Sequence, residues 1–233
     1  MFDKIKYLID MNIIGFWYSF YTNYMKGISK NNNFGSNQTK IFNRPEKYLA
    51  GLSDGECDYT INDYPVWVES IDSTEYIGLV NIFPNISCLG LITPFCTELF
   101  DTRDQTKIIG YLILIPYEYY DNDKLYEFSL GHELGHLSNN HLSSINNGEI
   151  LNDIDKEIEA DKFSATRYQD GYLSMNDCIS GLNKIFEISI SSTIKSIPYL
   201  NKKYRNNIDG VISRFKKYNK PFKQRLDAIS KLV

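Results

Sequence analysis

Residues 132–136 read His-Glu-Leu-Gly-His, and residues 157–161, beginning twenty-five positions after the first histidine, read Glu-Ile-Glu-Ala-Asp. Two histidines four positions apart lie on one face of a helix, about one turn from each other, so both imidazoles can reach one metal ion. Glu133, between them, then lies beside that ion. A carboxylate on a second helix completes a tetrahedral site with one open position, the arrangement of a catalytic zinc ion. The two segments therefore predict a zinc site between two helices.

The residues before the motif predict a strand followed by a helix. Residues 107–116 are apolar and rich in β-branched side chains, which is typical of a buried strand. Residues 121–123, Asp-Asn-Asp, supply side chains that favour the start of a helix. Gly131 and Gly135 lower helix propensity, and we take them as marks of a close approach by a neighbouring element.

The second segment offers two candidate ligands. Glu157 and Asp161 are four residues apart and share a helix face. This favours Glu157 as the ligand and Asp161 as the hydrogen-bond partner of a ligating histidine, with His132 as the first choice. Glu159 is the competing ligand, but it lies about 200° around the helix from Glu157, so only one of the two can face the metal. The alternative is a solvated acidic helix start that interacts with the helix dipole.

The third histidine of the chain, His141, raises the question of a metzincin site. That class requires His-Glu-x-x-His-x-x-Gly-x-x-His, with the third histidine six positions after the second. Here the offset is five, and Asn139 stands at the glycine position. We therefore expect His141 to be a surface or helix-end residue that faces away from His132.

The motif segment resembles the gluzincin metallopeptidases of the HtpX and CAAX-prenyl-protease kind, including their Oma-type relatives. The likeness rests on the two motifs above, on the run that ends in Gly171-Tyr172, and on the segment Pro221-Phe-Lys-Gln-Arg225-Leu226. It covers roughly residues 107–233. Residues 128–136 are also similar to the ImmA/IrrE family of intracellular regulators that cleave repressors, although that family more often has Asn at the position of Asp161.

The resemblance implies three metal ligands: His132, His136 and Glu157. It implies Glu133 as the general base. It leaves the residue that stabilises the oxyanion open, because the family usually has a histidine just before its proline, and Asn219-Lys220 stands there instead. Tyr172 and Arg225 are candidates for that role, and a solvated positive charge on a terminal helix is an equal alternative for Arg225.

The order of these patterns predicts an α+β fold of the zincin-like kind, with a small sheet packed on the active-site helices and a mostly helical C-terminal half. We expect residues 1–40 to form an N-terminal helix (1–26) and a polar linker (27–40), and residues 41–233 to form the metallopeptidase domain. Ser174 opens a capping box with Asp177.

Further strand-like runs are Pro65–Val68 and Tyr76–Phe83. Peptide substrates of such enzymes can bind as an added strand along a sheet edge. Our candidate for that edge is the strand Ile108–Ile115.

The cysteine spacing and the uncharged runs indicate where in the cell we expect this protein. The four cysteines show no Cys-x-x-Cys spacing and no secretory signal precedes them, so we expect reduced thiols and a cytoplasmic protein, with a Cys88–Cys96 bridge as the alternative. Residues 11–25 carry no charge, but fifteen residues are short of a membrane span. An interfacial N-terminal helix is therefore an alternative that we do not favour.

Charge is uneven along the chain. Residues 195–233 hold eleven Lys or Arg against two Asp or Glu, although the net charge of the protein is −4. We favour a basic tail that folds back on the acidic body over one that meets an anionic surface. The acidic balance and the lack of a nucleic-acid-binding motif argue against DNA or RNA as a partner.

The sequence thus predicts a zinc-dependent endopeptidase that acts on a protein or peptide. The alternative is a catalytically silent, peptidase-like module that binds metal and acts through a protein partner. The sequence leaves the oligomeric state and the substrate open.

Overall fold

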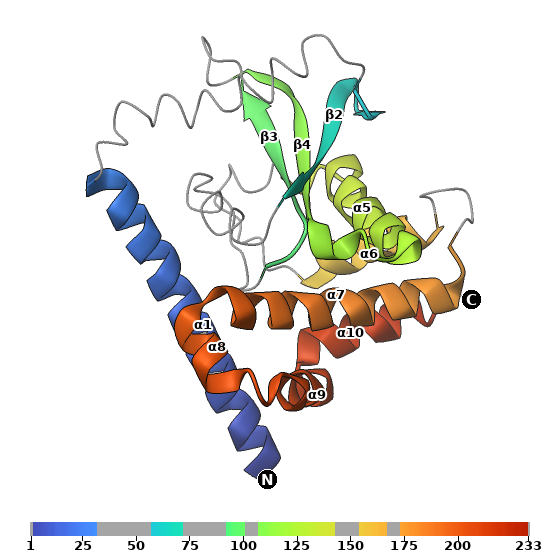
Figure 1. Ribbon diagram of the computed structural model, residues 1–233. Coiled ribbons are helices and arrows are strands. Elements are labelled where there is room, and N and C mark those ends of the chain that lie inside the picture. Colours follow the sequence, from blue (N-terminus) through green and yellow to red (C-terminus); the bar gives the residue numbers. More distant parts are fainter. Residues whose placement is uncertain are drawn as a thin grey trace.

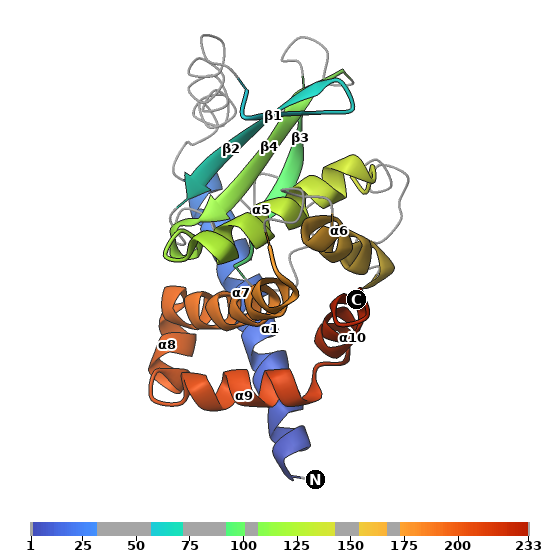
Figure 2. The same ribbon diagram turned by 90° about the vertical axis from the view of Figure 1, so that its right-hand side faces the viewer.

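The computed structural model describes residues 2–31, 57–71, 92–100, 107–142, 154–166 and 173–232. A small sheet lies at one end of the molecule, two helices lie beneath it, and a layer of further helices closes the other end (Figures 1 and 2). The predicted α+β class is confirmed.

The sheet has four strands among the described residues: β1 (Tyr59–Ile61), β2 (Tyr64–Ile71), β3 (Phe95–Phe100) and β4 (Ile108–Pro116). Their order is β1-β2-β4-β3. Strands β2 and β4 are parallel, whereas β1 pairs with β2 and β3 pairs with β4 in the antiparallel sense. The sheet is therefore mixed.

The strand predicted for residues 107–116 is β4, but its predicted place at the sheet edge is wrong. Strand β4 pairs with β2 on one side and with β3 on the other. Its residues from Gly110 to Pro116 are all buried, because an apolar run without alternation is suited to a strand covered on both faces. Among the described strands, β3 forms the edge next to β4.

Besides the single-turn η1 (Tyr117–Tyr119), the helices in the described part of the chain are α1 (Phe2–Asn31), α5 (Asp123–Ser138), α6 (Ile154–Thr166), α7 (Met175–Ser196), α8 (Pro198–Tyr204), α9 (Ile208–Tyr218) and α10 (Lys220–Ile229). Helix α5 lies directly under the sheet with α6 beside it, and α7 runs below both (Figure 1). The prediction of a mostly helical C-terminal half is confirmed.

Local sequence explains where the predicted helices begin. Asn122 caps α5, because its side-chain oxygen accepts a hydrogen bond from the Leu125 N–H at 3.0 Å. Ser174 and Asp177 form the predicted capping box at the start of α7. Of the two further strand-like runs, Pro65–Val68 lies within β2, and 76–83 falls outside the described residues.

The helix α5 is buried on all sides over residues 128–137. It meets α6 closely, because a Cβ atom added to Gly135 would lie 2.9 Å from the Cα atom of Ala160. The Ser164 hydroxyl of α6 donates to the Phe128 carbonyl of α5 at 2.8 Å. The close approach predicted at Gly135 is thus confirmed, and α6 is the neighbouring element.

The N-terminal helix is longer than predicted. Helix α1 continues through Gly27 to Asn31, so the first five residues of the expected polar linker are helical. This stretch contains no proline, and a single glycine costs a helix only about 1 kcal/mol. Residues 32–40 of that predicted linker lie outside the described part of the chain.

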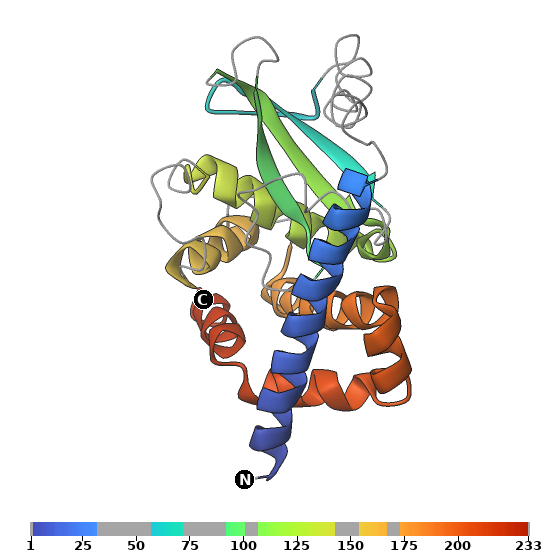
Figure 3. The same cartoon turned by 90° about the vertical axis from the view of Figure 1, so that its left-hand side faces the viewer.

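Helix α1 crosses the C-terminal helices along the side of the molecule (Figure 3). Its buried Asp10 accepts hydrogen bonds from Arg214 at 2.7 and 2.9 Å and from the Tyr204 hydroxyl at 3.1 Å. The Trp17 ring stacks on Tyr199 with centroids 4.0 Å apart. No helix within the described residues is long and apolar enough to cross a membrane.

The basic C-terminal segment folds back on acidic residues, as favoured above. Its cations pair with carboxylates of other elements in four places: Arg214 with Asp10, Lys216 with Glu187, Lys217 with Asp3, and Arg225 with Glu157 and Asp161.

We predict that Gly135→Ala destabilises the protein, because the new methyl group would overlap the α6 backbone. Overpacking of this kind costs about 1–3 kcal/mol. The control is Gly15→Ala in α1, where nothing lies within 4 Å of the added Cβ atom and the better helix former stabilises by about 0.5–1 kcal/mol. Urea denaturation of both variants measures the difference, and equal midpoints would contradict the close approach.

Candidate metal centre

Two helices supply the predicted site residues. Helix α5 places His132, Glu133 and His136 in its buried portion. Helix α6 presents Glu157 and Asp161 to them, one turn apart on the face that meets α5. The structure therefore brings together five of the residues that the sequence singled out.

Three ligand atoms lie in a compact triangle. The Nε2 atoms of His132 and His136 are 3.0 Å apart. Glu157 Oε2 is 3.5 Å from His132 Nε2, and Glu157 Oε1 is 3.5 Å from His136 Nε2. Tetrahedral ligands at about 2.0–2.1 Å from zinc lie about 3.3 Å from each other. The triangle matches one face of such a tetrahedron, and the three side chains can hold a metal ion.

The predicted hydrogen bond between Asp161 and His132 is present. His132 Nδ1 lies 2.9 Å from Asp161 Oδ1. Because the carboxylate can only accept, Nδ1 carries a proton, and in the neutral ring that a metal ion requires the Nε2 lone pair is then directed toward the triangle. This partner fixes both the tautomer and the ring orientation.

The Arg225 side chain is buried and donates hydrogen bonds to the carboxylates of Asp161 and Glu157. Its Nε and Nη2 donate to Asp161 at 2.7 and 2.8 Å, and its Nη1 donates to Glu157 Oε2 at 2.7 Å. The side chain is buried and comes from α10, at the far end of the chain. The alternative of a solvated charge is thus wrong. Tyr172, the other oxyanion candidate, lies outside the described residues.

Buried charges shift the pKa values of the ligating groups in opposite directions. Burial lowers the pKa of His132, but the hydrogen bonds with Asp161 and Glu157 outweigh it and raise that pKa to about 10. Burial and the neighbouring His132 lower the pKa of His136 to about 3. Without metal, His132 is therefore protonated at neutral pH and His136 is neutral, so a metal ion would displace a proton.

The two carboxyl groups stay ionised for a common reason. Burial alone would raise the pKa of Glu157, yet Arg225 and the histidines hold it well below its usual range. Burial alone would likewise raise the pKa of Asp161, but the nearby charges, that of Arg225 above all, lower it. Once His132 has given up its second proton, these two anions and one guanidinium leave a net negative charge beside an incoming cation.

Glu133 lies in the same buried environment with a partner that the sequence did not indicate. Burial raises the pKa of Glu133 to about 7, while its attraction to His132 opposes the shift. The buried thiol of Cys96, on β3, hydrogen bonds to Glu133. No local pattern links Cys96 to the motif, because the contact depends on where β3 packs against α5. Cys96 is a free thiol, so the alternative of a Cys88–Cys96 bridge is wrong.

The expectation that His141 lies on the surface and faces away is also wrong. Helix α5 ends at Ser138, and Asn140 adopts a positive φ of 55°. The chain thus folds back, and the His141 N–H donates to the His136 carbonyl at 2.9 Å. His141 is buried, with Nδ1 2.9 Å from His136 Nδ1 and Nε2 3.1 Å from Glu159 Oε2. Glu159 therefore bonds to His141 and leaves the triangle to Glu157.

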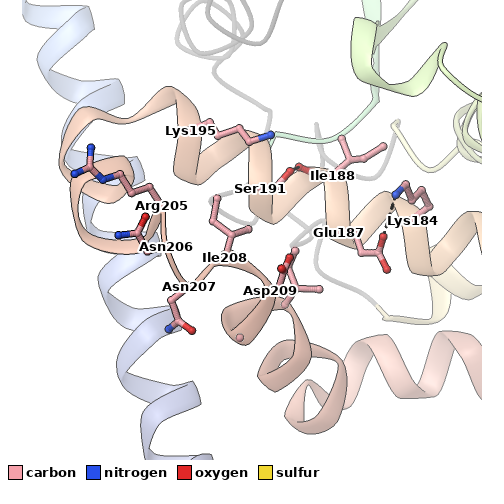
Figure 4. Close-up of a pocket in the computed structure, with 12 residues that line it drawn as sticks. Lys184, Glu187, Ile188, Ser191, Lys195, Arg205, Asn206, Asn207, Ile208 and Asp209 are labelled. Carbon is pink, nitrogen blue, oxygen red and sulfur yellow. Dashed lines mark hydrogen bonds and ion pairs between the residues drawn. The ribbon is translucent and has the colours of Figure 1, made fainter.

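A separate pocket lies among the C-terminal helices (Figure 4). It has a volume of about 560 Å³ and shares no residue with the histidine cluster. Its wall comes from α7, the turn after α8 and the start of α9, with Lys195, Arg205 and Asp209 among the lining side chains. Lys184 and Glu187 in this wall pair with each other at 3.2 Å. Charges of both signs line this pocket.

Comparisons with models of protein families, with curated proteins and with solved structures found no match for this chain. The site is therefore interpreted from its own geometry: two histidines and a glutamate around one point, a buried glutamate beside them, and a carboxylate–guanidinium pair that supports both helices.

We predict that Arg225→Met strongly destabilises the metal-free protein, because it removes the guanidinium that donates to the buried Asp161 and to Glu157. Removal of one partner of a buried pair costs about 3–5 kcal/mol. The control is Lys217→Met, which removes a pair with Asp3 that is exposed on both sides and should leave the urea midpoint unchanged. A small effect of Arg225→Met would contradict the role of this pair.

Proposed function

We propose that this protein is a zinc-dependent endopeptidase of the His-Glu-x-x-His gluzincin class. The observation that supports the proposal is the triangle of His132, His136 and Glu157, with Glu133 beside it on the same helix. The motif resemblance to the HtpX, CAAX-prenyl-protease and ImmA/IrrE families points to the same class. A metal-binding module without turnover remains the second candidate, and the test below separates the two.

The donor set fits zinc. Two imidazole nitrogens and one carboxylate oxygen are the ligands of many catalytic zinc sites, which keep a fourth position open. Both histidines present Nε2 to the same point, and each has a partner on Nδ1. Sites for magnesium or calcium are instead built from oxygen ligands.

The chemistry supplied by a zinc ion bound there is Lewis acidity, which lowers the pKa of a coordinated water to about 7. Glu133 is the base: one carboxylate oxygen takes a proton from the attacking water and later delivers it to the leaving amine. Its burial supports this task, because removal from water raises the pKa of the carboxyl group and makes it a better proton acceptor. The Cys96 thiol helps to orient that carboxylate.

The substrate would lie along β3. This strand is the sheet edge nearest the site among the described strands, and Cys96 connects it directly to Glu133. An extended peptide that pairs with a strand edge gains main-chain hydrogen bonds with little demand on its sequence. Strand β4, the edge predicted from sequence, has no free side for this purpose.

We predict that Glu133→Gln retains the metal but loses hydrolysis, because the amide can no longer accept a proton. Bound zinc is measured by elemental analysis and cleavage with an unfolded protein or a peptide library. One zinc per chain in both proteins, with cleavage by the wild type alone, is the expected result. Cleavage by the zinc-loaded variant would refute Glu133 as the base.

The same measurement distinguishes the peptidase from the metal-binding module without turnover. Zinc in both proteins without cleavage by either would contradict the peptidase and favour the binding module. No stoichiometric zinc in the wild type after reconstitution would refute both, since both depend on the metal.

A pair of proline substitutions tests the β3 edge. Successive residues of a strand point their N–H groups to opposite sides, and proline has no N–H. Of Thr97→Pro and Glu98→Pro, we expect the variant that breaks the ladder with β4 to lower the thermal midpoint. The other should raise KM for peptide hydrolysis and change the midpoint less. If neither variant raises KM, the substrate does not bind along β3.

A further inference from the structure

The structure assigns a second positioning role to a pair outside the predicted ligand set: we infer that His141 and Glu159 hold His136 in the tautomer and orientation that bind the metal. The inference rests on the metal site proposed above. It concerns the histidine whose Nδ1 faces an imidazole instead of a carboxylate.

The two ligating histidines are supported differently. His132 has Asp161 directly on its Nδ1 at 2.9 Å. The Nδ1 of His136 instead faces the Nδ1 of His141, also at 2.9 Å. A ligating histidine normally donates this N–H to a carboxylate, a carbonyl or water. An imidazole takes that place here, and it can accept only through a ring nitrogen that carries no proton.

Glu159 determines which nitrogen of His141 carries the proton. His141 Nε2 lies 3.1 Å from Glu159 Oε2, and a carboxylate oxygen can only accept. When the His141 ring carries one proton, that proton therefore lies on Nε2, and the Nδ1 lone pair can accept from His136. His136 in turn carries its proton on Nδ1 and presents the Nε2 lone pair to the triangle. The two hydrogen bonds run in one direction, from His136 through His141 to Glu159.

The fold supports this geometry from a third element. Asn62, at the turn between β1 and β2, donates to the Leu137 carbonyl at 3.3 Å and to Asn140 Oδ1 at 3.1 Å. These bonds hold the left-handed turn that follows α5 and returns His141 to His136. His141 is only 4% exposed, so its ring is fixed by packing as well as by hydrogen bonds.

The side chain of Glu159 is 59% exposed. Outer partners of metal-ligating histidines typically contribute a factor of 10–100 in metal affinity. If Glu159 were only a solvated surface charge, its removal would leave metal affinity unchanged. The positioning role and the surface-charge alternative therefore predict different metal affinities, and these can be measured without turnover.

The experiment measures zinc affinity by competition with a chromophoric chelator, in the inactive Glu133→Gln background. We expect His141→Phe, which keeps an aromatic ring but removes the acceptor, to weaken zinc binding about 10–100-fold. His141→Asn places an amide oxygen near the former Nδ1 position and should recover most of the affinity. Equal affinities for His141→Phe and the parent would overturn the inference.

Glu159 gives a second test that does not disturb the core. Glu159→Leu should weaken zinc binding, whereas Glu159→Gln keeps an acceptor and should bind nearly as the parent does. If Glu159→Gln bound zinc as weakly as Glu159→Leu, the loss of charge and not the loss of the acceptor would explain the effect, and the inference would be overturned.

These outcomes are separable from those of the proposed function. If the parent binds zinc and His141→Phe and Glu159→Leu bind it equally well, only the positioning role fails. If the parent binds no zinc, the metal site itself fails and the positioning role is overturned with it.

Discussion

The buried carboxylate of Asp161 is the point at which three helices of this protein meet. It accepts two hydrogen bonds from Arg225 of α10 and one from His132 of α5, while lying on α6 itself. A carboxylate removed from water in this way is stable only when cations and donors replace its hydration. The same guanidinium reaches Glu157, so a single cation from the end of the chain orders both acidic residues beside the histidines.

The close contact between α5 and α6 is a second requirement, beside the charge of Arg225. Gly135 lets the backbone of α6 approach α5 at Ala160, and only at that separation can Glu157 reach both imidazoles. The glycine thus has a purpose in a helix that would otherwise be more stable with alanine. The result is a candidate metal site whose three donor side chains come from two helices, each held in place by its own packing. Such support is what a preorganised metal centre requires.

Much of this arrangement follows from local sequence, and the exceptions share a cause. The spacing within residues 132–136 and 157–161 predicted the helical faces, and Asn122 and Ser174 predicted where helices begin. The central position of β4 was not predictable, because an apolar run reports burial but not its neighbours. His141 was misplaced, because extrapolation of helix α5 ignored the left-handed turn at Asn140. The role of Arg225 stayed open between an oxyanion candidate and a solvated charge, because its partners lie more than sixty residues away in the sequence.

By itself, the sequence determined the class of fold and the chemistry that the two motifs could offer. Helical periodicity and side-chain donor types are local properties, so His132, Glu133, His136 and Glu157 could be named in advance. Tertiary structure alone decided what surrounds them: the Arg225 guanidinium, the Cys96 thiol and the His141–Glu159 pair. These partners come from distant segments or from a reversed turn, and their positions depend on how layers pack, which no local pattern of residues encodes.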